Sequence, residues 1–251
     1  MNNRFRPVIK ANMLKAVFFD IDDTLYSTSV FAAQARKNSV FAMINAGLKM
    51  PYPDLLKELE EVISEFSSNY EHHFNKLLLR IPNKYYEDIN PAIVIASGVV
   101  AYHNTKFNGI KSFPDVIPAL KYLRKTDLVR GIISSGLEIK QAEKLLRLGI
   151  YNLLTPTAIF FSDQIGISKP NPKLYLRACQ ELDILPEEAM YVGDNPALDI
   201  DPAHKIGMVT VLVKRPYNKH ITEKGRAKPD HIITSFSQLI AILRKKYRIS
   251  L

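Results

Sequence analysis

The 251-residue sequence has very little cysteine and no long apolar run, and each absence excludes a class of protein. The single cysteine, Cys179, cannot form an internal disulfide, which excludes a disulfide-stabilised secreted fold. No apolar run approaches the roughly 18 residues of a membrane-spanning helix, so no membrane association is expected. The basic start MNNRFRPVIKANMLK lacks an apolar stretch followed by a small-residue cleavage site, so we expect no secretory signal. These absences together predict a cytoplasmic protein.

Two kinds of cofactor site are also missing from the sequence. It contains no G-x-G-x-x-G fingerprint of a dinucleotide-binding turn. The histidines are scattered, and the one adjacent pair, His72 and His73, would point about 100° apart on a helix. With a single cysteine beside these histidines, a zinc site is not predicted.

Positive charge is in excess, with 34 Lys and Arg against 25 Asp and Glu and a formal net charge of +9. The one dense basic cluster is Arg244, Lys245, Lys246 and Arg248, at the end of an expected terminal helix, where cations complement the helix dipole. No groove-entering motif accompanies this cluster, so nucleic-acid binding is not predicted. A general excess of positive charge would instead attract a small phosphorylated metabolite.

The hydrophobic periodicity changes twice along the chain. Residues 14–20 form a short apolar run that ends in an acid, which is typical of a buried parallel strand. From about residue 28 to 106 the apolar residues follow helical spacing, interrupted by Gly and Pro. Beyond this stretch, strand-like and helix-like segments alternate. Further strands are expected at 129–134, 158–161, 189–194, 209–213 and 231–234.

This order of elements predicts an α/β protein, because strands separated by helix-length segments form a parallel sheet. The sheet-containing core would comprise residues 13–27 and 109–251. Residues 28–108 would form an inserted, all-helical domain of about four helices. Residues 1–12 are expected to be a poorly ordered N-terminal extension.

Acidic, basic and hydroxyl side chains follow the expected strands. They are Asp20, Asp22 and Thr24 after the first strand, Ser134 and Ser135 after the second, Lys169 in a later loop, and Asp194 and Asp199 after the fourth. In open α/β sheets, ligands bind beyond the carboxyl ends of the strands. We therefore expect these segments, distant in the sequence, to meet at one site.

This set of side chains suits phosphoryl transfer. The Asp20 carboxylate can attack phosphorus and form an acyl phosphate, which divides one difficult hydrolysis into two easier steps. Repulsion opposes this attack, because each pair of like unit charges at about 4 Å costs about 4 kcal/mol at an effective dielectric of about 20. A Mg²⁺ ion on carboxylate oxygens and the Lys169 ammonium would offset that repulsion. The Ser134 hydroxyl and the neighbouring backbone N–H at Ser135 can hold the remaining phosphoryl oxygens.

Asp22 has a separate expected role as general acid and base. It would donate a proton to the leaving oxygen and then accept one from the hydrolytic water. Phosphate release at the full rate after Asp22→Asn would contradict this role.

In this order, the segments resemble the four motifs of the haloacid dehalogenase superfamily of phosphohydrolases. The resemblance spans nearly the whole chain apart from residues 1–12. The matching residues are Asp20-Ile21-Asp22-Asp23-Thr24, Ser134, Lys169 in SKPNP, and Gly193-Asp194 with Asp199 in GDNPALD. This resemblance implies a Rossmann-like, three-layer core with a mobile helical cap inserted after the first strand.

The resemblance also implies the ligands of the site. Mg²⁺ would be bound by the carboxylates of Asp20 and Asp194 and by the backbone carbonyl of Asp22. Ser134 and Lys169 would hold the phosphate.

Supporting roles follow from the same resemblance. Asp199 would support the metal or the lysine. The segment from Asp22 to Ser27, which includes Thr24, would carry a turn that couples to movement of the cap. Closure of the cap over the substrate would exclude water.

Several alternatives remain open within and outside this superfamily. Haloacid dehalogenases lack an acid at the position of Asp22, because a leaving halide needs no proton. Phosphonate hydrolases use a cap lysine as a Schiff base, whereas the lysines of residues 28–108 are interpreted as surface charges. Sugar-phosphate mutases share all four motifs. A non-catalytic binding protein of the same fold would usually have lost the nucleophile or a metal ligand, and both are present here.

We therefore expect a phosphatase that acts on a small phosphorylated metabolite, as a monomer or homodimer. The sequence does not define the substrate. By the resemblance, specificity would come from side chains of the cap. The candidates are Tyr70, Lys76, Arg80, Tyr85, Tyr86 and Tyr102.

Overall fold

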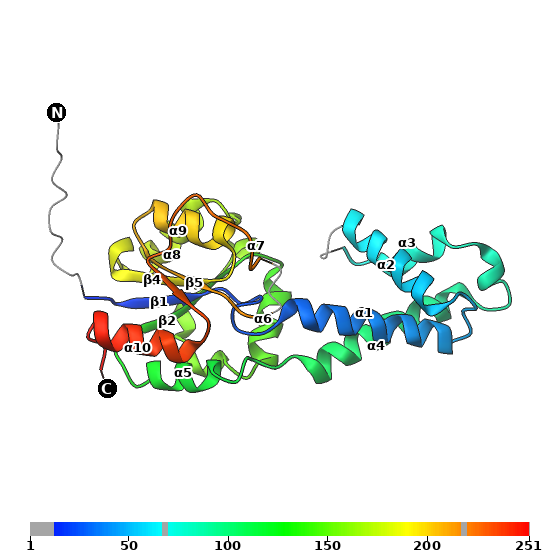
Figure 1. Ribbon diagram of the computed structural model, residues 1–251, viewed down its shortest axis with the longest axis horizontal. Coiled ribbons are helices and arrows are strands. Elements are labelled where there is room, and N and C mark those ends of the chain that lie inside the picture. The colour runs from blue at the N-terminus through cyan, green and yellow to red at the C-terminus, as the bar shows by residue number, and fades with distance from the viewer. Residues whose placement is uncertain (1–12, 67–69, 217–219, 251) are drawn as a thin grey trace, which may run out of the picture. The chain divides into compact units, whose positions relative to one another are not determined.

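The structure is a computed structural model that describes residues 13–66, 70–216 and 220–250 (Figure 1). The expected N-terminal extension, residues 1–12, lies outside the described residues. The chain divides into two compact units. One unit runs up to Ser27 and resumes at Lys111, and the other is Thr28–Ile110.

The first unit is built around a six-stranded sheet in which all neighbouring strands are parallel. The strands are β1 (Ala16–Phe19), β2 (Val129–Ser134), β3 (Ile159–Phe161), β4 (Ala189–Gly193), β5 (Val209–Val213) and β6 (His231–Ile233). They lie in the order β3-β2-β1-β4-β5-β6, so the chain extends the sheet first to one side of β1 and then to the other. The predicted α/β class with a parallel sheet is confirmed. The strand order reverses between β1 and β4, which is where such sheets bind ligands.

Helices cover both faces of this sheet. They are α5 (Val116–Leu123), α6 (Glu138–Arg147), α7 (Ser162–Ile165), α8 (Pro172–Glu181), α9 (Asp201–Lys205) and α10 (Phe236–Lys246). Short helical turns are η2 (Tyr151–Leu153), η3 (Pro156–Ala158), η4 (Pro186–Glu188) and η5 (Pro196–Ile200). Figure 1 shows α8 and α9 on one face and α5 and α10 on the other. The unit therefore has three layers.

The central strand β1 explains why its sequence reads as a continuous apolar run. Its four residues are all buried, because helices pack on both sides of it. Phe18 belongs to the apolar cluster that includes Leu174 and Tyr175 of α8. Phe19 faces the other way and stacks on Phe236 of α10, with ring centroids 5.6 Å apart. Alternate residues of one strand thus hold the two helical layers, as the two-residue period of a strand requires.

Among its described residues, the second unit contains helices joined by loops and no strand. Its elements are α1 (Thr28–Asn45), α2 (Tyr52–Phe66), α3 (His73–Arg80), η1 (Asn83–Tyr85) and α4 (Pro91–Gly109). Helix α4 begins where the Asn90 side chain accepts a hydrogen bond from the Ala92 N–H at 2.9 Å, with Pro91 at the first helical position. Buried residues of α1, α2 and α3, among them Met43, Leu59 and Leu77, share one apolar core.

Helices α1 and α4 are long but not uniformly apolar. Asn38 of α1 donates a hydrogen bond to the Thr105 hydroxyl of α4 at 2.8 Å, so their contact includes polar side chains. Among the described residues, no helix combines the length and the apolar character needed to cross a membrane.

Candidate active site

The two adjacent strands at the switch point each lead into an aspartate. Phe19 of β1 pairs with Val192 of β4, and the Asp20 N–H donates to the Val192 carbonyl at 2.9 Å. The strands end at Phe19 and Gly193, one residue earlier than the sequence indicated. Asp20 and Asp194 are therefore the first residues of the loops beyond the sheet, and both side chains lie at the edge where ligands bind.

Lys169 lies between two of the predicted acids. It belongs to the loop that joins α7 to α8, and its Nζ is 2.5 Å from Oδ1 of Asp20 and 2.7 Å from Oδ1 of Asp199. Only 4% of its side chain is exposed. The Ser134 hydroxyl, at the end of β2, donates to the same Oδ1 of Asp20 at 3.2 Å. Both of these bonds are made to Oδ1 of Asp20 and neither to Oδ2.

Asp199 lies in the helical turn η5 and supports the site by hydrogen bonds. Its Oδ2 accepts hydrogen bonds from the backbone N–H groups of Asp194 at 3.1 Å and Asn195 at 2.9 Å. This contact explains the glycine before Asp194. A Cβ at Gly193 would lie 2.5 Å from Oδ2 of Asp199, closer than real Cβ atoms approach an oxygen. Asp199 thus fixes the loop that carries Asp194 and also holds Lys169.

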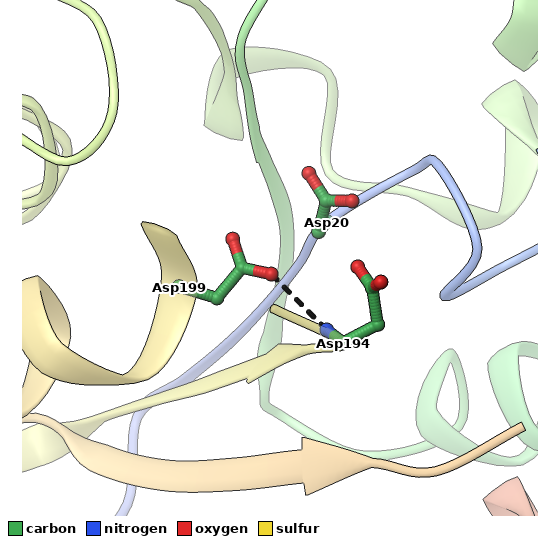
Figure 2. A group of neighbouring side chains, drawn as sticks. All are labelled: Asp20, Asp194 and Asp199. Atoms are coloured by element: carbon green, nitrogen blue, oxygen red, sulfur yellow. Dashed lines mark hydrogen bonds between the residues drawn. The ribbon is translucent and has the colours of Figure 1, made fainter. Parts of the chain in front are cut away.

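Three carboxylates converge closely enough to hold a cation. Asp20, Asp194 and Asp199 each offer an oxygen, and these oxygens lie within 4.8 Å of one another (Figure 2). Thr24 is fully buried and donates to Oδ1 of Asp194 at 3.4 Å. Hard oxygen donors of this kind fit Mg²⁺. Both oxygens of Asp199 are engaged, Oδ1 by Lys169 and Oδ2 by two backbone N–H groups, whereas Lys169 and Ser134 both bond Oδ1 of Asp20.

Burial and charge perturb the ionisation of this cluster. Burial raises the pKa of Asp20 to about 6; Lys169 opposes this shift, and the charges of Asp199 and Asp22 add to it. For Lys169, burial alone would lower the pKa, but Asp199 and Asp20 outweigh it and hold the pKa well above its usual value. The lysine is therefore an ammonium at neutral pH. Strongly perturbed groups gathered at a strand edge are a sign of a functional site.

Ser135 has a side-chain contact that the sequence did not indicate. Its Oγ accepts a hydrogen bond from the Lys169 backbone N–H at 3.1 Å and one from the Ser168 hydroxyl at 3.1 Å. Its carbonyl accepts from the Gln141 side chain at 2.6 Å. The hydroxyl of Ser135 thus ties the loop after β2 to the loop that carries Lys169. Phosphate binding by the Ser135 backbone N–H stays a prediction.

Asp22 is held by residues outside the carboxylate cluster. Both of its oxygens lie 2.7 Å from Nζ of Lys144, and the Tyr26 hydroxyl donates to Oδ1 at 2.8 Å. Sequence reasoning missed Lys144 and Tyr26. Tyr26 lies four residues after Asp22, which was the only local signal. Lys144 lies on α6, 122 positions away, and no motif marks it.

The six candidate specificity residues of the helical unit differ in how they are engaged there. Arg80 pairs with Glu65, with one contact of 3.0 Å between Nη1 and Oε1. The Tyr86 hydroxyl donates to the Leu78 carbonyl at 3.1 Å. The side chains of Arg80 and Tyr86 thus join neighbouring segments of this unit. The others make ring contacts: Tyr70 with Phe66, Lys76 with Phe66, Tyr85 with Lys84, and Tyr102 with Phe31.

Comparison with known proteins agrees with this arrangement. The family model described as haloacid dehalogenase-like hydrolase matches residues 14–207. A glyceraldehyde 3-phosphate phosphatase of Methanopyrus kandleri is 44% identical over 236 residues, covering 93% of this chain and 98% of that protein. A protein of the same name from Pyrococcus furiosus is 39% identical, covering 93% of this chain and 94% of its own length.

A solved structure supports the fold independently. The HAD phosphatase from Thermococcus onnurineus superposes with a TM-score of 0.64 at 24% identity, covering 92% of this chain and 98% of that one. Such a likeness bears on the fold alone, whereas the family match and the sequence relatives extend over most of the chain. The predicted family is confirmed: this chain belongs to the haloacid dehalogenase-like hydrolases.

Proposed function

We propose that this protein is a Mg²⁺-dependent phosphatase that hydrolyses a small phosphate monoester through an aspartyl phosphate on Asp20. One observation carries the proposal. A buried ammonium, Lys169, and a hydroxyl, Ser134, both contact the Asp20 carboxylate, and Asp194 lies close enough to share a cation with it. These side chains would supply a nucleophile, two phosphate-binding groups and a metal position around one point.

The relatives suggest a substrate. Proteins at 44% and 39% identity that align over nearly the whole chain are named glyceraldehyde 3-phosphate phosphatases. Glyceraldehyde 3-phosphate, a small three-carbon phosphate monoester, is accordingly the proposed first substrate. A mutase that uses the same core would return an isomeric phosphate ester in place of inorganic phosphate.

The first half-reaction transfers the phosphoryl group to the enzyme. A carboxylate oxygen of Asp20 attacks phosphorus while the bond from phosphorus to the leaving oxygen breaks. The carboxyl of Asp22 donates its proton to that oxygen, and the alcohol departs. Lys169, Ser134 and the backbone N–H of Ser135 hold the phosphoryl oxygens during this transfer.

The second half-reaction returns the enzyme to its starting state. The Asp22 carboxylate accepts a proton from water while the water oxygen attacks phosphorus. The bond between phosphorus and Asp20 breaks, so inorganic phosphate leaves and the Asp20 carboxylate is restored. Asp22 is again protonated and ready for the next substrate.

The metal position and its supports complete the proposal. Asp20 and Asp194 would hold Mg²⁺ through their carboxylates, and Asp22 through its backbone carbonyl. When bound, Mg²⁺ would supply positive charge that neutralises the phosphoryl oxygens. Asp199 and Thr24 support this arrangement by fixing Lys169 and Asp194.

The proposal extends to the role of the helical unit, the location and the assembly of the protein. The residues of the helical unit, Thr28–Ile110, are proposed as the substrate-covering cap of the family. A cytoplasmic location is proposed, and the single cysteine, Cys179, which leaves no internal disulfide, supports it. A monomer or homodimer is proposed, and light scattering of the purified protein would decide between them.

The test is a substrate panel measured with and without Mg²⁺. Phosphate release would be followed for glyceraldehyde 3-phosphate and other small phosphate esters, using wild type and Asp20→Asn. We expect release from at least one ester, its loss on chelation of Mg²⁺, and its loss in Asp20→Asn. Release that survives both changes would remove the mechanism, and conversion to an isomeric ester would favour the mutase.

A further inference from the structure

The carboxylate of Asp22 is clamped from two sides. Lys144 of α6 places its Nζ 2.7 Å from each of the two carboxylate oxygens, and the Tyr26 hydroxyl lies 2.8 Å from Oδ1. A cation that bridges both oxygens fixes the direction in which the carboxyl group points, and charge-assisted bonds of this length are strong. The side chain of Asp22 therefore has a defined orientation.

This ion pair differs from the surface pairs of the same molecule. Only 15% of the Lys144 side chain is exposed, although 34% of the Asp22 side chain is open to solvent. In the exposed pair Lys57 and Glu61, the corresponding values are 77% and 50%. A largely buried lysine that bonds a half-open acid is expected to hold its geometry, whereas exposed pairs contribute little.

The backbone around Asp22 is fixed independently of Lys144. Asp23 has a positive φ of 51°, which turns the chain sharply after Asp22. Tyr26 pairs with Ser112, and the Phe113 N–H donates to the Leu25 carbonyl at 2.9 Å. The turn thus fixes the backbone position of Asp22, and the contacts with Lys144 and Tyr26 fix the position of its carboxylate.

We propose that Lys144 is a positioning residue for proton transfer by Asp22, with Tyr26 as its second contact; this inference rests on the proposed function. Helix α6 starts shortly after Ser134 and Ser135, so one element follows the predicted phosphate loop and carries Lys144. The bonds from Lys144 and Tyr26 hold the Asp22 carboxyl group in one orientation, so it faces the same way at each of the two proposed proton-transfer steps.

The structural alternative is that Lys144 only stabilises the fold, and the leaving group separates the two roles. An alkyl phosphate expels a basic alkoxide that needs a proton, whereas p-nitrophenyl phosphate expels a phenolate that does not. The ratio kcat/KM depends only on the steps from substrate binding up to and including release of the alcohol or phenol. A defect in proton donation therefore lowers kcat/KM for the alkyl ester selectively, and general destabilisation lowers both values together.

The experiment compares wild type, Lys144→Met, Lys144→Arg, Asp22→Asn and the double variant Asp22→Asn/Lys144→Met on glycerol 3-phosphate and p-nitrophenyl phosphate. General acids contribute about 10²- to 10⁴-fold, so we expect Asp22→Asn to lose about 10²-fold or more on the alkyl ester. Lys144→Met should lose about 10-fold on that ester and less than about 3-fold on the aryl ester. The double variant should match Asp22→Asn within about 2-fold, because both changes remove one function.

Controls keep each outcome decisive. Lys144→Arg should recover part of the selective loss, and Lys121→Met, at an exposed lysine of α5, should behave as wild type. Tyr26→Phe removes only the hydroxyl and should give a smaller loss with the same selectivity, which provides a second test if Lys144→Met does not fold. Equal losses on both esters, or a loss additive with that of Asp22→Asn, would overturn the inference. An Asp22→Asn variant without selective loss would overturn the proposed role of Asp22 itself.

Discussion

Nζ of Lys169 lies 2.5 Å from Oδ1 of Asp20, with 4% and 9% of the two side chains exposed. The expected nucleophile is thus paired with a buried cation that also contacts Asp199 at 2.7 Å. Removing one partner of a buried ion pair costs much free energy, because water cannot solvate the charge that remains. The same ammonium suits an incoming phosphoryl oxygen, so one residue serves the resting site and the proposed reaction.

Lys169→Met is expected to abolish most of the activity. The change removes the positive charge proposed to bind the phosphoryl group, and losing one such donor costs on the order of 10²-fold or more in kcat. Lys169→Arg should not restore full activity, because the planar guanidinium does not place its charge at the same point. Steady-state kinetics would measure both variants. Lys173→Met, at an exposed lysine four residues on, is the matched control, and near-normal turnover by Lys169→Met would contradict the proposed role.

Gly193→Ala is expected to damage the site more than the fold. Its new Cβ would meet Oδ2 of Asp199 at 2.5 Å, so the Asp199 side chain must move away from the N–H groups that hold it. Displacements of about 1 Å in a catalytic site can cost about 10²-fold in rate.

The readout for this variant is kcat/KM together with the thermal unfolding temperature. Gly109→Ala is the control, because its Cβ would make only an ordinary contact, 3.8 Å from Phe31. Full activity of Gly193→Ala would show that the close approach of Asp199 is not required.

Arg215 is expected to be a main support of the first unit. It follows β5, is 6% exposed, and its guanidinium bonds both oxygens of Asp115 at 2.9 Å. Its Cζ lies 4.3 Å from the ring centroid of Phe113 and 5.3 Å from that of Phe236. Arg215→Met leaves the Asp115 carboxylate without its partner, so we expect a loss on the order of 3 kcal/mol in the free energy of unfolding. Urea denaturation would measure it, and Arg177→Met, at an exposed ion pair, should cause no measurable change.

The stabilisation by Arg215 should depend on pH. Burial would raise the pKa of Asp115, but the bonds from Arg215 and from the Phe236 N–H outweigh it and lower that pKa. The pKa in the folded state is then below the unfolded value of about 3.9. The contribution of the pair is present above that unfolded value and is lost as pH falls through the folded pKa. The difference in the free energy of unfolding between wild type and Arg215→Met should therefore become smaller in strong acid. A larger difference there would contradict the stabilising role of the pair between Arg215 and Asp115.

Cys179 is expected to be unreactive in the folded protein. Burial raises the pKa of its thiol to about 11, and the charge of Glu187 adds to this shift. Because the thiolate is the reactive form, very little of it exists at neutral pH. Intact mass measurement after iodoacetamide treatment should find no alkylation of native protein and complete alkylation in denaturant. Rapid labelling of the native protein would mean that this thiol is accessible.

The parallel sheet and the convergence of the candidate site residues at one of its edges were predictable from the sequence for a physical reason. Strands buried on both faces read as short apolar runs, and β1 is such a strand. Residues that follow parallel strands gather at one edge, which is why Asp20, Ser134 and Asp194 meet. The strand ends were predicted one residue late at Asp20 and Asp194, because strand ends depend on pairing with neighbours rather than on local composition.

Side-chain contacts away from the strand ends were not predictable. The clamp on Asp22 needs the exact register of α6 against the turn after β1, and a lysine on a helix normally indicates a solvated face. Arg215 likewise appears exposed by residue type, and its burial needs Asp115, Phe113 and Phe236 from two other parts of the chain. These interactions depend on tertiary packing, which periodicity does not encode.

Phosphorylation of Asp20 itself can be detected by reductive trapping. Enzyme turning over its best substrate with Mg²⁺ would be quenched in acid and treated with borohydride, which reduces an aspartyl phosphate to homoserine. Mass spectrometry of the tryptic peptide of residues 16–36 would then locate the reduced residue. We predict homoserine in place of Asp20, and none without substrate or in Asp20→Asn. Homoserine in place of Asp22, or no reduction during undiminished phosphate release, would contradict the covalent mechanism.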